Sequence, residues 1–375
     1  MPSSTLQNPD PRRILVRGVN WLGDAVMTLP ALRRLRERFS NAHISILTHS
    51  KLEDLWRGQA VVDDVITFSK GDSVLKVGWV LRAQRFDLAL VLPNSPRSAL
   101  ETWFARIPKR IGYARSGRNW LLTRAVPSRP GRVPMKKRTP GEIRALIKAP
   151  PTAPAIAETA HQIHEYLHMV AELGASAVPV APSLQVSGEE MAATSAKLLD
   201  KWLQERGLGA SVVLLGLNPG AEYGPAKRWP AENFAAVARE ICRRLPNSVW
   251  IAFGGPGDAR VCAEIERLAD GRVLSLAAKT TLRQLMALLK SCRVLLTNDS
   301  GPMHLAAALD TPVVVPFGST SPELTGPGLP GDTRHAILRS PTPCAPCFLR
   351  ECPIDFRCMT GITLNQVVDA VLERL

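Results

Sequence analysis

The sequence predicts an α/β protein made of two Rossmann-like domains, and three observations indicate this fold class. Short apolar runs alternate with amphipathic helical patterns in both halves of the chain, which is the order expected of parallel β-α-β units. At 375 residues the chain is long for one domain. A stretch of small residues and prolines at 174–187 precedes a fresh start of the pattern. We therefore expect an N-terminal domain at 1–180 and a C-terminal domain at 181–375.

Apolar runs in the first half predict strands, and the amphipathic stretches between them predict helices. Ala25–Phe39 repeats apolar residues at helical spacing and carries arginines on the opposite face. A second helix is expected at Val74–Gln84. The expected strands are Arg13–Arg17, His43–Thr48, Asp64–Phe68 and Asp87–Pro93.

The second half repeats the alternation. Its expected helices are Gly188–Arg206, Ala231–Arg244, Ala259–Leu268 and Leu282–Lys290, and its expected strands are Val212–Leu217, Ser248–Gly254, Val273–Leu276, Val294–Leu296 and Val313–Gly318. The last helix of the chain is a candidate to pack back on the N-terminal domain. Pro127–Pro154 breaks the alternation. It is rich in Pro, Gly, Arg and Lys, and predicts a long basic loop with a short helix near Gly141–Lys148.

The chain carries a formal net charge of +14, and the excess is concentrated between Arg106 and Arg138. A basic field favours an anionic partner, such as nucleic acid, an anionic membrane surface or a phosphorylated substrate. Only 5% of residues are aromatic, and no basic motif studded with aromatics is present, so nucleic acid is the weaker candidate. A merely basic soluble protein is the remaining alternative.

Targeting signals are absent from the sequence pattern. No run approaches the roughly 20 apolar residues of a transmembrane helix, and Met1–Asp10 is short and polar, without the apolar region of a secretory signal. We therefore expect a cytoplasmic protein that touches the membrane from inside.

The turn Asn298–Gly301 joins a buried strand to an Ala/Leu-rich helix, with Pro302 suited to the first helical turn. Ligands bind beyond the carboxyl ends of parallel strands, and a helix N-terminus offers free backbone N–H groups to an anion, most often phosphate. Asp299 is awkward beside an anion, so it is a candidate to accept hydrogen bonds from sugar or ribose hydroxyls. The alternative, that Asp299 or Ser300 only caps the helix, is equally open.

The loop Asn218–Pro230 also leaves a strand and enters a helix. It combines small residues such as Gly220 and Ala221, which allow close backbone approach, with the cations Lys227 and Arg228. A diphosphate needs both features. Because this loop and the Asp299 turn lie at the same edge of the same predicted sheet, we expect a phosphate site there.

A dinucleotide-binding fold would place Gly-x-Gly-x-x-Gly after the first strand. Gly18–Gly23 lacks the second glycine, and in Gly254–Asp258 a proline interrupts the spacing. A nicotinamide or flavin oxidoreductase is therefore disfavoured. Gly254–Asp258 does follow a strand, and Asp258 is a candidate acceptor for a ribose hydroxyl.

Four motifs resemble the lipopolysaccharide heptosyltransferases of glycosyltransferase family 9. They are Asn20-Trp21-Leu22-Gly23-Asp24, the loop Pro219–Pro230, Thr297–His304 and Phe317–Pro322. The loop Pro219–Pro230 and the cysteines between 344 and 358 are similar to the second heptosyltransferases in particular. The resemblance runs from about Arg13 to Leu375. It implies a GT-B fold, an ADP-heptose donor, a lipid A-core acceptor (heptosyl-Kdo-lipid A) at the membrane surface, and inversion at the anomeric carbon with no required cofactor or metal. Pro127–Pro154 departs from the family pattern.

The resemblance also implies roles for single residues. Asp24 matches the catalytic aspartate, which takes the proton of the acceptor hydroxyl, and Gly23 beside it is a donor-binding candidate. Lys227 matches the lysine that neutralises the donor phosphates, Asp299 matches the aspartate near the heptose, and Ser300 and Gly301 supply N–H groups to the diphosphate. His304 either binds the donor or packs the helix. The alternative for Asp24 is an N-cap of the helix Ala25–Phe39, and one residue can do both.

Four of the seven cysteines fall within fifteen residues, at Cys344, Cys347, Cys352 and Cys358. Four thiolates can close a tetrahedral zinc site, although only the first pair has the usual short spacing. The favoured alternative is a reduced cluster that holds a loop near the donor pocket.

The sequence thus predicts an inverting ADP-heptose:lipopolysaccharide heptosyltransferase on the inner face of the inner membrane. Another nucleotide-sugar transferase on the same fold and a basic nucleic-acid-binding protein are the rival hypotheses. The oligomeric state stays open.

Overall fold

The computed structural model describes residues 10–148, 156–209 and 211–375, which form two compact units. Unit 1 comprises Met1–Arg132 and Ile163–Val180, and unit 2 comprises Val133–Gln162 and Ala181–Leu375. The linker between them passes through 174–187 without helix or strand until Gly188. Of the residues that the division at 180/181 assigns to the N-terminal domain, 133–148 and 156–162 group with unit 2.

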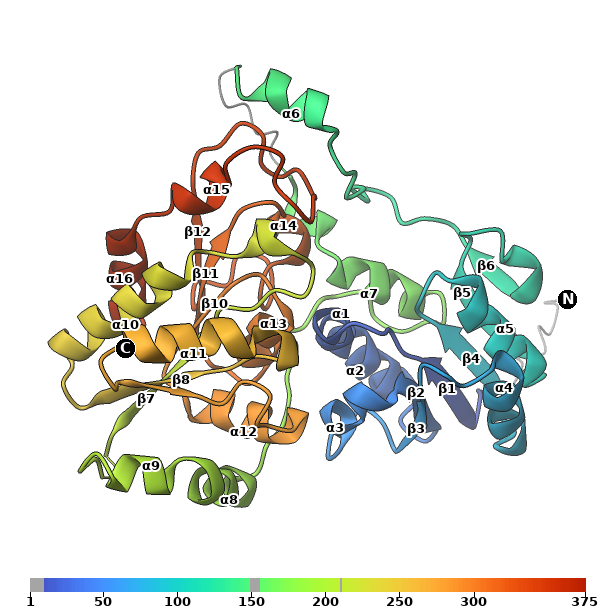
Figure 1. The fold of residues 1–375 in the computed structure, drawn as a ribbon. Helices are drawn as coiled ribbons and strands as arrows, with labels where there is room; N and C mark the ends of the chain where they lie inside the picture. The colour runs from blue at the N-terminus through green and yellow to red at the C-terminus, as the bar shows by residue number, and fades with distance from the viewer. Residues whose placement is uncertain (1–9, 149–155, 210) are drawn as a thin grey trace, which may run out of the picture. The chain divides into compact units, whose positions relative to one another are not determined.

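Unit 1 contains a six-stranded parallel sheet in the order β3-β2-β1-β4-β5-β6 within the described residues (Figure 1). The strands are β1 (Arg13–Arg17), β2 (His43–His49), β3 (Asp64–Phe68), β4 (Leu88–Val91), β5 (Lys109–Tyr113) and β6 (Arg124–Val126). Its α-helices are α1 (Leu22–Met27), α2 (Leu29–Arg38), α3 (Glu53–Trp56), α4 (Val74–Ala83), α5 (Pro96–Phe104) and α7 (Ile163–Ala171).

The expected helix Ala25–Phe39 begins earlier and is divided in two. Trp21 is the N-cap of α1, and the break falls at Thr28, two residues before Pro30. The Thr28 hydroxyl donates to the Ala25 carbonyl at 2.6 Å, a local bond that competes with regular helical pairing. Strands β5 and β6 were not expected, because β5 begins with two cations and β6 is only three residues long.

Helices α4 and α5 cover one face of the unit 1 sheet and lie side by side. Val77, Leu81 and Ala99 belong to the same buried cluster as Leu15 and Ala89 of the strands. The two helices approach closely at Gly78, where a Cβ would lie 2.7 Å from the Cβ of Phe104. Elsewhere in unit 1, helix α2 packs against helix α7.

Unit 2 contains a second six-stranded parallel sheet, in the order β12-β11-β10-β7-β8-β9 within the described residues. Its strands are β7 (Val213–Asn218), β8 (Ser248–Ala252), β9 (Val273–Ser275), β10 (Leu295–Thr297), β11 (Val313–Phe317) and β12 (Ala336–Arg339). Its α-helices are α6 (Pro140–Leu146), α8 (Gly188–Leu198), α9 (Asp200–Gln204), α10 (Ala231–Arg244), α11 (Ala259–Leu268), α12 (Leu282–Ser291), α13 (Gly301–Ala308), α14 (Pro322–Thr325), α15 (Arg357–Thr360) and α16 (Leu364–Leu372).

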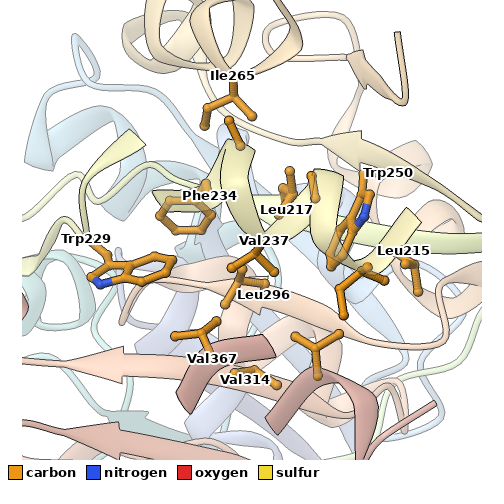
Figure 2. Packing of buried hydrophobic residues seen from close by; sticks show 14 of the residues in the cluster. Leu215, Leu217, Trp229, Phe234, Val237, Trp250, Ile265, Leu296, Val314 and Val367 are labelled. Atoms are coloured by element: carbon orange, nitrogen blue, oxygen red, sulfur yellow. The ribbon is translucent and has the colours of Figure 1, made fainter. Parts of the chain in front are cut away.

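The core of unit 2 lies between α10, α16 and the sheet, and Figure 2 shows its aromatic and aliphatic side chains. Trp229 and Phe234 meet edge to face with ring centroids 5.3 Å apart, an arrangement that aromatic pairs prefer. The last helix, α16, buries Val367 and Val371 in this cluster and packs on α10, β11 and β12. These contacts all lie within unit 2.

Part of the basic segment Pro127–Pro154 is anchored to unit 2. Thr139 and Glu142 form a capping box at the start of α6. The helix buries Ile143 against Cys344 and Cys347, and the Arg138 N–H donates to the Cys347 carbonyl at 3.0 Å. Residues 149–154 of the segment lie outside the described residues.

Both sheets have the Rossmann strand order, and this order determines where a ligand can bind. The order of strands reverses between β1 and β4 in unit 1 and between β7 and β10 in unit 2. In such sheets the ligand crevice lies outside the carboxyl ends of the strands at that switch point. The loops after β1, β7 and β10 therefore lie at the ligand positions of this fold, and they carry most of the predicted site residues, whereas Asp258 lies in the loop after β8.

Candidate active site

In unit 2, two asparagines tie together the loops that follow β7 and β10. The Asn218 amide donates to the Gly220 carbonyl at 3.3 Å and to the Thr297 and Ser300 hydroxyls at 3.2 and 3.0 Å. Asn298 donates to the Pro219 carbonyl at 2.7 Å and accepts from the Trp229 N–H at 3.0 Å. Both asparagines are buried, so the two loops are held in one arrangement at the switch point.

Lys227 and Asp299, which are 72 residues apart in the sequence, form an ion pair between these loops. The Lys227 Nζ lies 2.5 Å from Asp299 Oδ2, and the Thr320 hydroxyl donates to the same oxygen at 2.5 Å. The Asp299 side chain is 5% exposed and that of Lys227 13%. A charge buried to this extent needs a partner, and here each supplies the other. The ion pair thus joins the β7, β10 and β11 loops at one point.

Helix α13 begins directly after Asp299, with Ser300 as its N-cap. Ser300 thus takes the N-cap position that the sequence offered, but its side chain forms no cap hydrogen bond. The Asp299 side chain is held by Lys227 and Thr320. The Ser300 hydroxyl is instead held by Asn218 and Thr297. The first N–H groups of α13 keep the partial positive charge that attracts an anion.

His304 lies one turn into α13 and is 6% exposed. Burial lowers its pKa to about 4, with Lys227 lowering it further and Asp299 opposing the shift. The imidazole is therefore neutral at physiological pH. This agrees with a packing role and makes His304 a poor partner for a phosphate, which prefers cationic donors.

The buried histidines predict a loss of stability in mild acid. An unfolded histidine takes up a proton near pH 6.5, whereas burial holds the pKa of His304 and His335 at about 4. Because the unfolded state binds more protons between these values, the free energy of unfolding should fall as pH drops from about 6.5 to 4 and level off below. Each group contributes on the order of 3 kcal/mol.

Urea denaturation of the parent protein and of the variants H304Q and H43Q between pH 4 and 7.5 measures this slope. His304→Gln should flatten it, whereas replacement of the half-buried His43 is the control. Equal slopes for the parent and H304Q would contradict the assignment to His304.

Gly220 and Asp258 meet near the start of the loops that follow β7 and β8. A Cβ on Gly220 would lie 2.6 Å from Asp258 Oδ1, so a larger residue would have to displace the Asp258 side chain. Asp258 accepts from the Gly255 N–H at 3.0 Å. Ala221 is buried beside them. The structure thus brings Gly220, Ala221 and Asp258 together, although Asp258 already has one hydrogen-bonding partner.

The segment after β12 supports the Lys227 loop. The Arg350 carbonyl accepts from the Ala226 N–H at 2.9 Å, and the Phe348 carbonyl accepts from the Tyr223 hydroxyl at 2.7 Å. The Tyr223 ring lies under Lys227, with the Nζ 5.0 Å from its centroid. Gly224 has φ of +152°, where an L side chain is strained and would also meet Arg350. Lys227 is therefore directed by its neighbours rather than free on the surface.

The four late cysteines line one small cavity together with Ala226 and Ser319. Burial raises the pKa of Cys344 and Cys347, and that of Cys358 to about 12. No group of three or more Cys, His, Asp or Glu among the described residues is arranged to hold a metal ion. The arrangement therefore gives no support to the zinc alternative. The Cys347 and Phe348 N–H groups donate to the Ser319 carbonyl, which places this cluster directly behind Thr320.

In unit 1, Asp24 lies beyond the carboxyl end of β1, in the first turn of α1. Trp21 is the N-cap, so the alternative that Asp24 caps the helix is wrong. An acid in the first turn is still favourable toward the helix dipole. Gly23 and Asp24 are partly exposed, and the Trp21 ring beside them is 50% exposed with Lys51 over it at 5.3 Å.

A buried ion pair fixes the loop that carries Asp24. Arg17, the last residue of β1, donates from Nε to Glu101 at 2.8 Å, and both side chains are almost completely buried. Its Nη1 donates to the Gly18 carbonyl at 2.6 Å and to Asn20 at 3.1 Å. Glu101 also accepts from Arg97. The guanidinium thus connects α5 to the first residues of the loop that carries Asp24.

The change Arg17→Lys tests this connection. A lysine keeps the charge for Glu101 but lacks the planar fork, so it cannot also hold Gly18 and Asn20. We expect a loss of about 1–3 kcal/mol in the free energy of unfolding, measured by urea denaturation. Arg97→Lys is the matched control, since Arg97 contacts the same carboxylate but is 41% exposed and should cost little. Equal effects of the two changes would count against the role given to Arg17.

The basic stretch Arg106–Arg138 is not one continuous surface. Arg118 is completely buried and donates to the carbonyls of Pro93 and Tyr113, and burial lowers its pKa to about 10. Glu165 is surrounded by three cations, with contacts of 3.3 Å to Arg115 and Arg129 and 3.7 Å to Arg132. The expectation that the whole stretch faces an anionic partner is therefore wrong for Arg118, while the Glu165 cluster keeps an excess of positive charge.

Sequence reasoning missed three contributors to the unit 2 site: Asn218, Tyr223 and Thr320. The last follows β11, and its position after a strand of the same sheet was the available signal.

The helices of the described ranges are too short or too polar for any of them to span a bilayer.

Comparison with known proteins agrees with this geometry. Residues 74–139 and 139–356 match the model of glycosyltransferase family 9 (heptosyltransferase). Lipopolysaccharide heptosyltransferase 2 of Salmonella typhimurium is 32% identical over 326 residues, covering 84% of this chain and 85% of the relative. Lipooligosaccharide heptosyltransferase 2 of Haemophilus ducreyi is 31% identical, covering 84% and 86%.

Solved structures show the same fold. The structure of Escherichia coli ADP-heptose lipopolysaccharide heptosyltransferase II superimposes with a TM-score of 0.73 at 28% identity, covering 96% of this chain and 98% of that one. A family 9 glycosyltransferase from Veillonella parvula gives a TM-score of 0.76 at 22% identity, covering 96% of each chain. The resemblance seen in the sequence motifs is thereby confirmed, and the two Rossmann-like units are those of a GT-B glycosyltransferase. The chain belongs to glycosyltransferase family 9, the heptosyltransferases.

Proposed function

We propose that this chain transfers a heptose from ADP-heptose to a lipopolysaccharide inner-core acceptor that already carries one heptose, heptosyl-Kdo-lipid A. Its family membership and the names of its relatives support heptose transfer. The observation that carries the proposal is the Lys227–Asp299 pair beside the N-terminus of α13, at the switch point of the unit 2 sheet. A cation and free backbone N–H groups together suit a sugar diphosphate.

In this proposal unit 2 holds the donor. Lys227 and the N–H groups of Ser300 and Gly301 bind the diphosphate, Gly220 and Ala221 allow its close approach, and Asp258 accepts a ribose hydroxyl. Asp299 accepts from the heptose through its Oδ1, since Lys227 and Thr320 both contact Oδ2. His304, neutral and buried, packs behind the pair.

Unit 1 supplies the base. The acceptor hydroxyl oxygen attacks the anomeric carbon of the heptose while the bond from that carbon to the diphosphate oxygen breaks, and ADP leaves with the bonding electrons. Asp24 takes the hydroxyl proton, and Gly23 approaches the donor. Because attack comes from the face opposite the leaving group, the anomeric configuration inverts. The growing charge on ADP is met by Lys227 and by the helix N-terminus.

The acceptor is anionic and lipid-linked, and features of unit 1 suit it. Three arginines surround the single carboxylate of Glu165. This excess of guanidinium groups favours the binding of phosphate or carboxylate groups. We place the protein on the cytoplasmic side of the inner membrane, in peripheral contact with its surface.

A transfer assay with ADP-heptose and purified truncated lipopolysaccharides tests the proposal. Heptose should be added to an acceptor that ends in one heptose and not to one that ends in Kdo. Transfer to the Kdo-terminated acceptor, or faster transfer from another nucleotide sugar, would contradict the proposed substrate.

Ligand-induced thermal stabilisation separates the transferase from a nucleic-acid-binding protein. ADP should raise the melting temperature, because it binds the folded state selectively, whereas duplex DNA should not. Stabilisation by DNA alone would favour the rival class.

A further inference from the structure

Unit 1 carries an unusual patch of exposed apolar side chains on α4, α5 and the turn before β6. Of the eleven large hydrophobic side chains that the described residues expose, five lie here: Leu75, Trp79, Val80, Trp103 and Trp120. We call them the α4–α5 face. Trp79 is 67% exposed and Trp120 69%. Large aromatic side chains are rarely left in water to this extent without a binding role.

The two helices that carry the α4–α5 face pack against each other. Gly78, next to Trp79, packs against Phe104, and the rings of Trp103 and Phe104 have centroids 5.1 Å apart. Trp103 also meets Trp120 edge to face at 6.3 Å. Figure 1 shows α4 and α5 as neighbours in unit 1.

Core packing does not require these side chains. Both helices already bury an opposite stripe, including Val77, Leu81 and Ala99, against the sheet. The helices are therefore apolar on two faces, and only one of them is explained by the fold of the unit.

The charge around the face is almost entirely positive. Residues 73–125 contain ten Lys and Arg and only two acids, Asp87 and Glu101. Glu101 is buried against Arg17, and Asp87 accepts from the backbone N–H groups of Arg12 and Arg13. Three exposed cations lie on or next to these helices. Lys76 pairs with Asp72, Arg82 lies 5.3 Å from the Trp79 ring centroid, and Arg106 follows α5.

We propose that the α4–α5 face docks on an anionic phospholipid bilayer, with its tryptophans at the level of the headgroups. Tryptophan is favoured at membrane interfaces because its ring is apolar and its N–H is polar. Lysine and arginine beside it are attracted to anionic lipid. A second copy of the chain fits less well, because a two-fold interface would set the same cations against each other. The proposal deepens the proposed function, since it names the surface that brings the enzyme to its lipid-linked acceptor.

Vesicle flotation tests the proposal without depending on catalysis. Vesicles of phosphatidylcholine mixed with phosphatidylglycerol should bind the protein, and salt should weaken the binding, whereas phosphatidylcholine alone should bind it poorly. The double variant W79S/W103S, which changes no charge, should bind at least about tenfold more weakly. Trp202→Ser is the matched control, because Trp202 is half-buried on α9 of unit 2 under Arg206.

The outcomes separate this proposal from the proposed function. Unchanged vesicle binding by W79S/W103S, or equal loss in W202S, would overturn it. A parent dimer in solution that W79S/W103S converts to a monomer would also overturn it, because the face would then be occupied by a second copy. Transfer to a delipidated, water-soluble acceptor should be the same in the parent and the double variant. If neither the parent nor the double variant transfers heptose to this acceptor, while the parent still binds vesicles, the result would count against the proposed function alone.

Discussion

Replacement of Asp24 by Asn should lower the turnover of heptose transfer by about 10²–10⁴-fold, because it removes the general base. The side chain lies in the first turn of α1, beyond the carboxyl end of β1 at the switch point of the unit 1 sheet. Asn keeps the shape but not the charge, so a helix-dipole contribution of only about 0.3–1 kcal/mol is lost. ADP affinity should stay close to that of the parent, since the proposed diphosphate contacts come from unit 2. Single-turnover kinetics and ADP titration measure the two effects.

Asp54→Asn is the matched control for Asp24→Asn. Asp54 is also an acid in the first turn of a unit 1 helix, α3, and pairs with Arg57. The change Asp54→Asn should leave the turnover of heptose transfer unchanged. If Asp24→Asn turns over close to the parent rate, or melts the protein while Asp54→Asn does not, Asp24 is a structural residue and the base lies elsewhere.

Replacement of Lys227 by Ala should have the second largest effect. It removes the cation proposed to meet the charge of the leaving diphosphate, which is worth about 10²–10³-fold in turnover when a comparable donor is deleted. It also leaves the buried Asp299 carboxylate with a hydrogen bond from Thr320 but without its counter-charge, and an unpaired negative charge repels a diphosphate. We therefore expect weaker ADP binding together with slower transfer, measured by calorimetry and by the transfer assay.

Two further variants separate the roles of the ion pair. Lys279→Ala removes a lysine that also follows a strand of the unit 2 sheet but donates to the Ser275 carbonyl. This change should alter neither the ADP affinity nor the transfer rate. Asp299→Asn frees Lys227 from its counter-charge, so ADP should bind at least as well as in the parent while the KM for ADP-heptose rises. Loss of ADP binding in Asp299→Asn would show that the pair acts only by keeping the loops folded.

Much of the fold follows from local pattern. The apolar runs and amphipathic stretches predicted the strands near the centre of each sheet and helices such as Ala231–Arg244 and Ala259–Leu268, whose bounds the structure reproduces. These elements carry their own period of burial, so the signal is present in neighbouring residues. The two ligand-side loops of unit 2 were also predicted, because glycine, proline and cations between a strand and a helix are local features.

Elements and roles that depend on distant partners were not predicted. Strands β5, β6 and β12 are short edge or near-edge strands with charged residues, and they are held by pairing with strands elsewhere in the chain. Residues 133–148 gave no sign that they would pack on the cysteine segment some 200 residues later. The burial of Arg118 is set by carbonyl groups from two separate loops.

Local residue pattern was enough to predict two Rossmann-like halves, a phosphate-suited loop and turn in the second, and the motifs of glycosyltransferase family 9. The contacts of the side chains in those motifs emerged only in the folded chain. There, Trp21 rather than Asp24 is the N-cap of α1. The Ser300 hydroxyl is hydrogen-bonded by Asn218 and Thr297, and Lys227 forms an ion pair with Asp299. Capping, burial and ion pairing depend on which groups meet in space, and parallel sheets bring together the ends of strands that are far apart along the chain.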